Sequence, residues 1–211
     1  MAYDLEEQEQ LEAIKAWWSD NGRMVMSVVI AALLAIAAYQ GWRYYSAQQA
    51  ERAATLYSQL AEAERANEAK RVRDIASQII DRHPSTQYAG MAALSAAKAG
   101  VGTGELEEAK KNLQWAADKA KEEEMRDVAR LRLAGLLLDE KKYEEALKLL
   151  STQTSDAYAM LYADARGDVL SAQGKPAEAR AAYQLALDKT EAGSSYRRLI
   201  EVKLDALGEA K

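Results

Sequence analysis

The nineteen residues between Arg23 and Arg43 carry no charge, whereas charges recur every few residues in the rest of the chain. A helix rises about 1.5 Å per residue, so this segment would span roughly 28 Å, close to the hydrocarbon thickness of a bilayer. Its only strongly polar side chains are Ser27 and Gln40, and a helix satisfies its own backbone hydrogen bonds. The segment therefore predicts a transmembrane helix over residues 24–42.

Aromatic and basic side chains flank this segment on both sides. Rings with a polar edge favour the headgroup region of a bilayer, and arginine side chains can extend to the same region. We therefore predict membrane-interface anchors at Trp17, Trp18, Arg23, Trp42, Arg43, Tyr44 and Tyr45.

Two other interpretations of the apolar segment are a buried helix of a soluble bundle and a cleaved signal peptide. Ala35-Ile36-Ala37 has the small-x-small form of a cleavage site, but it lies inside the apolar run. Residues 1–23 hold six acidic and two basic side chains, whereas the region before a signal-peptide core is basic. An uncleaved anchor is the favoured interpretation.

The orientation of this anchor is not set by charge. Lys15 and Arg23 precede the span, and Arg43 and Arg52 follow it within a similar distance. Basic residues mark the cytoplasmic side and acidic residues count little, so the two sides are tied.

The remainder of the chain predicts one all-α domain. Alanine, leucine, glutamate, lysine and arginine dominate it, and these are strong helix formers. Its net charge is near zero, which excludes an electrostatic case for nucleic-acid binding, and the chain has no cysteine. The predicted organisation is an acidic tail with an amphipathic helix over 1–23, the span over 24–42 and a helical domain over 43–211.

Repeated turns divide this domain into helical hairpins. Ala109, Ala146 and Ala179 each follow a short turn and lie on an apolar stripe, and Val72 marks a weaker fourth copy. The spacings of 37, 37 and 33 residues lie near the 34 of a tetratricopeptide repeat. Small residues such as Ala134 and Gly167 would let the paired helices approach closely. Four hairpins are predicted.

The predicted helices have simple start and stop signals. Pro84 is expected to end one helix and Pro176 to open another. The segment 194–207 is expected to form a terminal capping helix, which covers the last open face of a helical stack. The expected helices cover 5–20, 24–42, 43–66, 69–82, 86–99, 105–122, 124–139, 142–150, 155–173, 176–189 and 195–207. The helix over 43–66 is expected to continue directly from the span.

No group of residues predicts catalysis, a metal site or a bound cofactor. His83 is the only histidine and is expected to be a cationic cap at a helix end, with no nucleophile arranged beside it in sequence. Gly100, Gly102 and Gly104 resemble a phosphate loop only superficially, because no strand precedes them and acidic residues follow; a turn between helices is expected. The run Glu122–Glu124 lacks the spaced ligands of a calcium loop.

A binding surface is the remaining kind of site. In tetratricopeptide repeats the first helix of each hairpin lines a concave groove, which can hold a peptide. Alignment by the repeated turns predicts a groove formed by Tyr57, Met91, Leu94, Lys98, Leu131, Asp164 and Asp168. For Leu94 and Leu131 a place in the core is the favoured alternative.

The N-terminal third also resembles a known family. The segment EQLEAIKAWWSDNG over residues 9–22, the span, and Gly41-Trp42-Arg43-Tyr44-Tyr45 are similar to the YfgM-type ancillary subunits of the bacterial Sec translocon. The resemblance extends over the degenerate repeats.

This resemblance implies a non-enzymatic, single-pass protein of the bacterial inner membrane. Its acidic N-terminus would be cytoplasmic and its repeat domain periplasmic. Its partners would be the SecYEG translocon, a membrane-anchored periplasmic chaperone of the PpiD type and unfolded exported chains, besides membrane lipid around the one helix. Neither nucleic acid nor a small-molecule substrate is implied.

Two other functions fit the residues as well. One is a scaffold for a cell-envelope assembly complex. The other is a regulator that binds a cytosolic partner through Leu11, Ile14 and Trp18 in the N-terminal tail.

Overall fold

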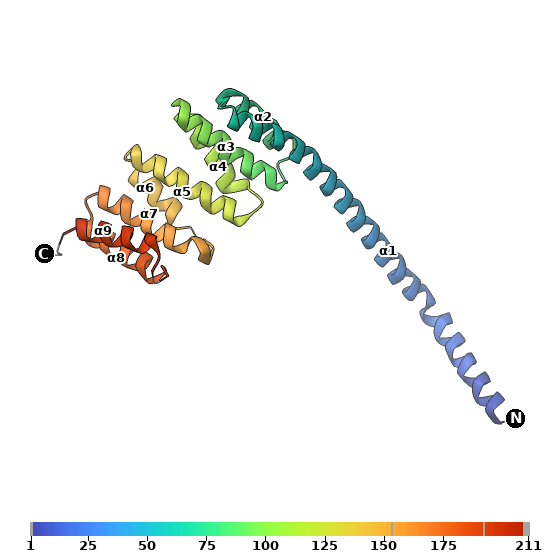
Figure 1. The fold of residues 1–211 in the computed structure, drawn as a ribbon. Helices are drawn as coiled ribbons and strands as arrows, with labels where there is room; N and C mark the ends of the chain where they lie inside the picture. Colours follow the sequence, from blue (N-terminus) through green and yellow to red (C-terminus); the bar gives the residue numbers. More distant parts are fainter. Residues whose placement is uncertain (1, 153, 192, 209–211) are drawn as a thin grey trace. The chain divides into compact units, whose positions relative to one another are not determined.

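The computed structural model of the chain describes residues 2–152, 154–191 and 193–208, without the side chains of 2–6 and 8. The ends of the predicted tail and repeat domain, residues 1 and 209–211, lie outside the described residues. The described part is all-helical, as predicted (Figure 1). Its helices are α1 (Ala2–Arg65), α2 (Ala69–Arg82), α3 (Gln87–Thr103), α4 (Leu106–Lys119), α5 (Glu123–Asp139), α6 (Tyr143–Leu150), a 3₁₀ turn (Asp156–Tyr158), α7 (Ala159–Ala172), α8 (Pro176–Asp188) and α9 (Ser195–Ala206).

Helix α1 is a single helix of 64 residues. The predicted continuity of the span with the helix over 43–66 is confirmed, and the segment over 5–20, which was expected to be a separate helix, belongs to it as well. Residues 1–65 contain no proline that would end the helix, and their alanine-rich stretches favour its continuation. The chain divides into two compact units, residues 1–48 and 49–211, and α1 contributes to both.

The predicted span is covered by nothing else in the described chain. The most apolar window of α1 has a mean hydropathy of 2.0 and is 0% buried. Leu34, near its centre, is 66% exposed. A core helix of a soluble bundle would be buried by its neighbours, so this feature favours the membrane interpretation.

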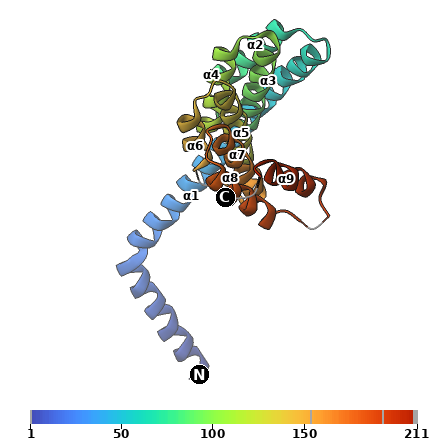
Figure 2. The same ribbon diagram turned by 90° about the vertical axis from the view of Figure 1, so that its left-hand side faces the viewer.

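The second unit contains the four predicted hairpins. They are the C-terminal part of α1 with α2, α3 with α4, α5 with α6, and α7 with α8, and α9 follows as the predicted terminal helix (Figures 1 and 2). Helix α2 ends two residues before Pro84, and Pro176 is the first residue of α8. Both proline predictions are confirmed.

Every hairpin turns through the same backbone geometry. One residue in each turn has a left-handed conformation, with φ of 56° at Asn67, 80° at Gly104, 59° at Lys141 and 76° at Gly174. The next residue donates its backbone N–H to the carbonyl five positions earlier, at 2.8–2.9 Å in all four turns. This is the Schellman arrangement, which satisfies a carbonyl at the end of the first helix. The weak first copy near Val72 therefore has the same turn as the other three.

The glycine run does not form the expected three-glycine turn. Gly100 and Gly102 lie inside α3, and only Gly104 leaves the helix. A Cβ on Gly100 would lie 3.2 Å from the Ala109 Cβ, so this glycine allows α3 and α4 to approach closely. Glycine costs a helix interior about 1 kcal/mol, and packing in the hairpin outweighs that preference.

His83 is not the cationic cap that the sequence predicts. Its side chain is 7% exposed, and its Nδ1 lies 2.5 Å from the amide oxygen of Gln49. Burial lowers the pKa of His83, and the nearby Arg52 and Arg82 lower it further. The imidazole is therefore neutral near pH 7 and joins α1 to α2 through a hydrogen bond.

The paired helices fit together through a small residue opposite a larger one. Gly167 on α7 faces Tyr183 on α8, because a Cβ at position 167 would lie 2.3 Å from the tyrosine ring. The equivalent positions in the other hairpins hold Ala134 with Leu150, Ala97 with Leu113 and, in the reverse order, Leu60 with Ala76. All are buried, so the combined volume is kept while the residues differ.

Gly167→Ala should destabilise the chain by about 1–3 kcal/mol, because the new methyl group overlaps the Tyr183 ring. The combined change Gly167→Ala and Tyr183→Leu should recover part of that loss, since it reproduces the Ala134 and Leu150 pair. Urea unfolding of the full-length chain in detergent, followed by circular dichroism, measures both.

Gly135→Ala is the matched control, because a Cβ there meets nothing within 4 Å. It should leave stability unchanged or raise it by up to about 1 kcal/mol. Equal losses from both alanine variants would contradict the proposed fit.

Candidate partner-binding groove

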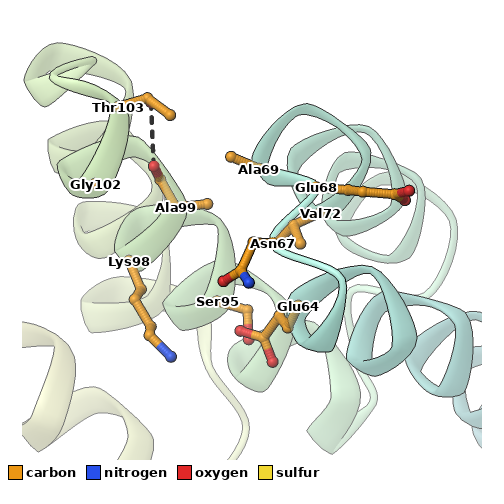
Figure 3. Close-up of a pocket in the computed structure, with 10 residues that line it drawn as sticks. All are labelled: Glu64, Asn67, Glu68, Ala69, Val72, Ser95, Lys98, Ala99, Gly102 and Thr103. Carbon is orange, nitrogen blue, oxygen red and sulfur yellow. Dashed lines mark hydrogen bonds between the residues drawn. The ribbon is translucent and has the colours of Figure 1, made fainter.

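Three cavities follow one another along the first helices of the hairpins. The first, of about 290 Å³, lies between the α1–α2 turn and α3 (Figure 3). The second, of about 390 Å³, lies between α3 and α5, and the third, of about 290 Å³, between α5 and α7. Lys98 lines the first two and Gly135 the last two. We call this series the first-helix groove.

The predicted groove residues occupy different environments along this face. Lys98 is exposed, and Tyr57 and Met91 are half-buried. The Tyr57 ring packs on Tyr88 with their centroids 5.6 Å apart. Leu94 is a core residue, whereas the half-buried Leu131 packs on the core and also lines the third cavity.

Asp164 and Asp168 are engaged by the terminal helix. The ammonium group of Lys203 on α9 donates to Asp164 at 2.9 Å and to Asp168 at 2.8 Å, and the Tyr183 hydroxyl donates to Asp168 at 2.8 Å. Asp164 is 4% exposed. The carboxylates that were predicted to meet a partner therefore anchor α9, and both also line the third cavity.

The pKa values of this cluster reflect burial among opposite charges. Burial raises the pKa of Asp164, and the Lys203 ammonium opposes that effect. For Lys203 burial lowers the pKa, but hydrogen bonds to Asp168 and Asp164 outweigh burial and raise it. Lys203 therefore stays protonated, and the cluster is an ion pair that closes one end of the groove.

Sequence reasoning missed Arg132 and Asp139, which line the second cavity with Lys98. Lys98 lies six residues before the left-handed residue of its hairpin, and Arg132 lies nine before that of the next. These offsets place both on the same face of consecutive first helices. Alignment by the turns places Gly135 at the position of Lys98, so Arg132, one helical turn earlier on the same face, was overlooked.

A buried acid, Asp127, lies on α5, one of the helices that form the first-helix groove. The Asp127 side chain on α5 is fully buried and accepts hydrogen bonds from the Ser155 backbone N–H at 3.2 Å and the Tyr162 hydroxyl at 3.0 Å. Arg130 donates to it at 3.2 Å. Burial raises the pKa of Asp127, but hydrogen bonds from Ser155 and Tyr162 contribute to a net lowering. This carboxylate ties the loop before α7 to α5.

Asp127→Asn should cost about 1–3 kcal/mol at pH 7, because a buried acceptor of several donors is lost. A carboxyl with a lowered folded-state pKa stabilises the fold above its unfolded pKa of about 3.9, and this contribution is lost as the pH falls below that value. Between pH 6 and pH 3, the difference from the unmodified chain should therefore stay constant at first and shrink as the pH falls below about 4. Urea unfolding across that range measures it.

Asp118→Asn is the matched control on exposed α4 surface, where Gln114 is the one donor to the carboxylate among the described residues. It should change stability by less than about 0.5 kcal/mol at every pH. A pH-independent loss at Asp127 would contradict the role of its charge.

The predicted interface residues of α1 are exposed at both ends of the apolar segment. Trp17, Trp18, Trp42, Tyr44 and Tyr45 are each at least half exposed. The Arg43 guanidinium lies 5.9 Å from the centre of the Tyr39 ring. Arg23 and Arg43 are twenty residues apart, or about 30 Å along a helix, which matches the hydrocarbon core of a bilayer.

Replacing both Leu33 and Leu34 by Arg should release the chain from the membrane, because each arginine costs about 2.5–3.5 kcal/mol at the centre of a span. Leu106→Arg with Leu185→Arg is the matched control, since both leucines are exposed in the repeat domain. Carbonate extraction of cell membranes measures the bound fraction. Equal retention of both variants in the pellet would contradict a membrane span.

The hairpins, their shared turn and the exposed apolar helix define a tetratricopeptide-repeat-like protein with one segment fit to cross a membrane. The sequence profile of the family described as "Tetratricopeptide repeat-like domain" matches residues 15–209.

Full-length relatives give a narrower family. The chain is 31% identical over 208 residues to the ancillary SecYEG translocon subunit of Neisseria gonorrhoeae, covering 98% of this chain and 100% of that protein. It is 26% identical to the Haemophilus influenzae protein of the same name over 98% and 100% of the two chains. Identity to the Escherichia coli protein is 29%, over 95% and 96%. The chain belongs to the family of ancillary SecYEG translocon subunits, as the resemblance implied.

Proposed function

We propose that this chain is a non-enzymatic adaptor that associates with the SecYEG translocon at the bacterial inner membrane. The observation that carries the proposal is the full-length match to relatives named ancillary SecYEG translocon subunits. The exposed apolar segment of α1 supports the membrane location, since the described chain leaves it uncovered.

The anchor and the repeat domain have separate tasks in this mechanism. Residues 24–42 hold the domain in the plane of the membrane, which raises its local concentration beside a membrane-embedded channel. The first-helix groove then binds a segment of a partner chain. Grooves of packed helices suit this task because they present apolar and charged side chains together along one face.

We further propose a cytoplasmic N-terminus and a periplasmic repeat domain. The equal numbers of nearby basic residues on the two sides of the span do not decide between orientations. A cysteine introduced at exposed Lys111 tests the assignment directly, because the chain has no other cysteine. A membrane-impermeant maleimide should label it in intact spheroplasts, and protection until lysis would reverse the assignment.

The partners in the periplasm would be a membrane-anchored chaperone of the PpiD type and chains leaving the channel. An adaptor that holds either one near the exit would shorten the time that an exported chain spends unfolded and unbound. Residue-specific photocrosslinking from Tyr57 and Lys98 in cells identifies which one contacts the groove.

A variant that lacks residues 1–42 should lose most of its co-purification with SecYEG, because the tether supplies the local concentration. The control replaces residues 24–42 by an unrelated nineteen-residue span of leucine and alanine and should restore association. Retention of SecYEG by the truncated variant would show that the repeat domain binds the channel without its anchor. Failure of the control would show that the native span itself contacts the channel.

Crosslinks only to envelope-assembly or division proteins would favour the scaffold function instead. Loss of function from deleting residues 1–20 alone, with SecYEG association intact, would favour the regulatory function of the tail.

A further inference from the structure

The second cavity of the first-helix groove combines apolar walls with two basic side chains. Lys98 from α3 and Arg132 from α5 both line it. Val101, Leu113 and Leu136 are the large apolar side chains that line it, and Val101 is 44% exposed. An exposed apolar wall beside cations is the arrangement expected where an amphipathic partner binds.

Neither cation is neutralised within the described part of the chain. No carboxylate of the described residues lies within salt-bridge distance of Lys98 or Arg132, whereas Arg73, Lys110 and Lys203, which bridge neighbouring helices, each have an acidic partner. In Figure 3 the Glu64 carboxylate lies on the same side of the first cavity as the Lys98 ammonium group and Glu68 lies on the far side, and neither forms a salt bridge with Lys98. The two cations are thus available to an outside anion.

One acidic residue, Asp139, also lines this cavity. It lies seven residues after Arg132 on α5, or about 10 Å along the helix axis. Lys98 lies at the same level as Gly135, which is between Arg132 and Asp139 on α5. Lys98 and Gly135 each lie six residues before the left-handed residue of their hairpin. The cavity therefore has Arg132 at one end, Asp139 at the other and Lys98 between them.

We propose that this cavity binds an extended segment of a partner polypeptide that carries an acidic side chain next to an apolar one. The carboxylate meets Lys98 and Arg132, and the apolar side chain enters the space beside Val101 and Leu136. The proposal rests on the proposed adaptor function and adds the chemistry that the groove recognises. Charge complementarity selects this occupant, since a basic segment would meet two unpaired cations.

The size of the cavity agrees with a peptide segment. A volume of about 390 Å³ is near the lower limit of small-ligand pockets and accommodates one or two side chains. The cavity adjoins the first cavity at Lys98 and the third at Gly135, because each of these residues lines both neighbours. An extended backbone could therefore continue along the groove in either direction.

The test uses the full-length chain in nanodiscs of neutral lipid and three amidated ten-residue peptides with a neutral dye. The peptides differ only at their centre, which is Leu-Glu-Leu, Leu-Gln-Leu or Leu-Lys-Leu. Fluorescence anisotropy should show the Glu peptide binding about 10-fold more tightly than the Gln peptide, because its carboxylate forms charge-assisted hydrogen bonds. The Lys peptide should bind most weakly, and raising the salt concentration should reduce the preference.

The variant with Lys98→Gln and Arg132→Gln should lose this preference while still binding the Gln peptide. The control variant with Lys111→Gln and Lys119→Gln has the same change in net charge on exposed positions of α4 and should keep it. Circular dichroism of each variant establishes that the helices are intact.

Three results would overturn the inference: no peptide binding, equal binding of the Glu and Gln peptides, or a preference that survives in the Lys98 and Arg132 variant. A crosslinked second copy of the chain in this cavity would also overturn it. Co-purification of the Lys98→Gln and Arg132→Gln variant with SecYEG is measured in parallel. If that variant retains SecYEG while any of these results is obtained, the cavity proposal fails and the adaptor function stands. The adaptor function is tested separately, by the loss of SecYEG from the variant that lacks residues 1–42.

Discussion

The close approach of the two helices in each hairpin is the constraint on which the repeat domain depends. A left-handed residue and the N–H to carbonyl bond after it reverse the chain in the same way at four places. The helices can then touch only if a small residue faces a larger one, as Gly167 faces Tyr183. The identities of the two facing residues vary between hairpins, but close packing limits the sum of their volumes. This explains how degenerate repeats keep one architecture.

The groove is a consequence of that packing. Because every hairpin turns alike, the first helices repeat along one face, and the spaces between them become a series of cavities. Gly135 supplies no side chain to fill the junction of the second and third. The series ends where Lys203 of α9 binds Asp164 and Asp168. The terminal helix thus both covers the last hairpin and neutralises acids that an added hairpin would otherwise have had to satisfy.

Local signals in the sequence were sufficient to predict the hairpins, but they did not predict pairings between residues far apart in the chain. The alanines at 109, 146 and 179 mark helix starts because their positions follow from turn geometry alone. The pairing of Lys203 with acids 35 and 39 residues away depends on where α9 packs. His83 was misassigned for the same reason: its local position favours a cationic cap, but Gln49 and the packing of α2 against α1 bury it. The continuity of the span with the helix over 43–66 was predicted, whereas the expected break between residues 20 and 24 is absent from α1. Within α1 the pattern changes from uniformly apolar to amphipathic.

That change of pattern in α1 has a structural meaning. Helix α1 is exposed on all sides from Met26 to Tyr45, and from Ala53 onward it buries Ala53, Leu60 and Ala63 in the core of the first hairpin. One uninterrupted helix therefore supplies both an apolar surface suited to lipid and the first helix of the repeat stack. Its backbone hydrogen bonds are internal, so the exposed part needs no support from the packed part. Removing residues 1–42 leaves every buried contact of the first hairpin in place, and a loss of translocon association in that variant would be attributable to the missing anchor.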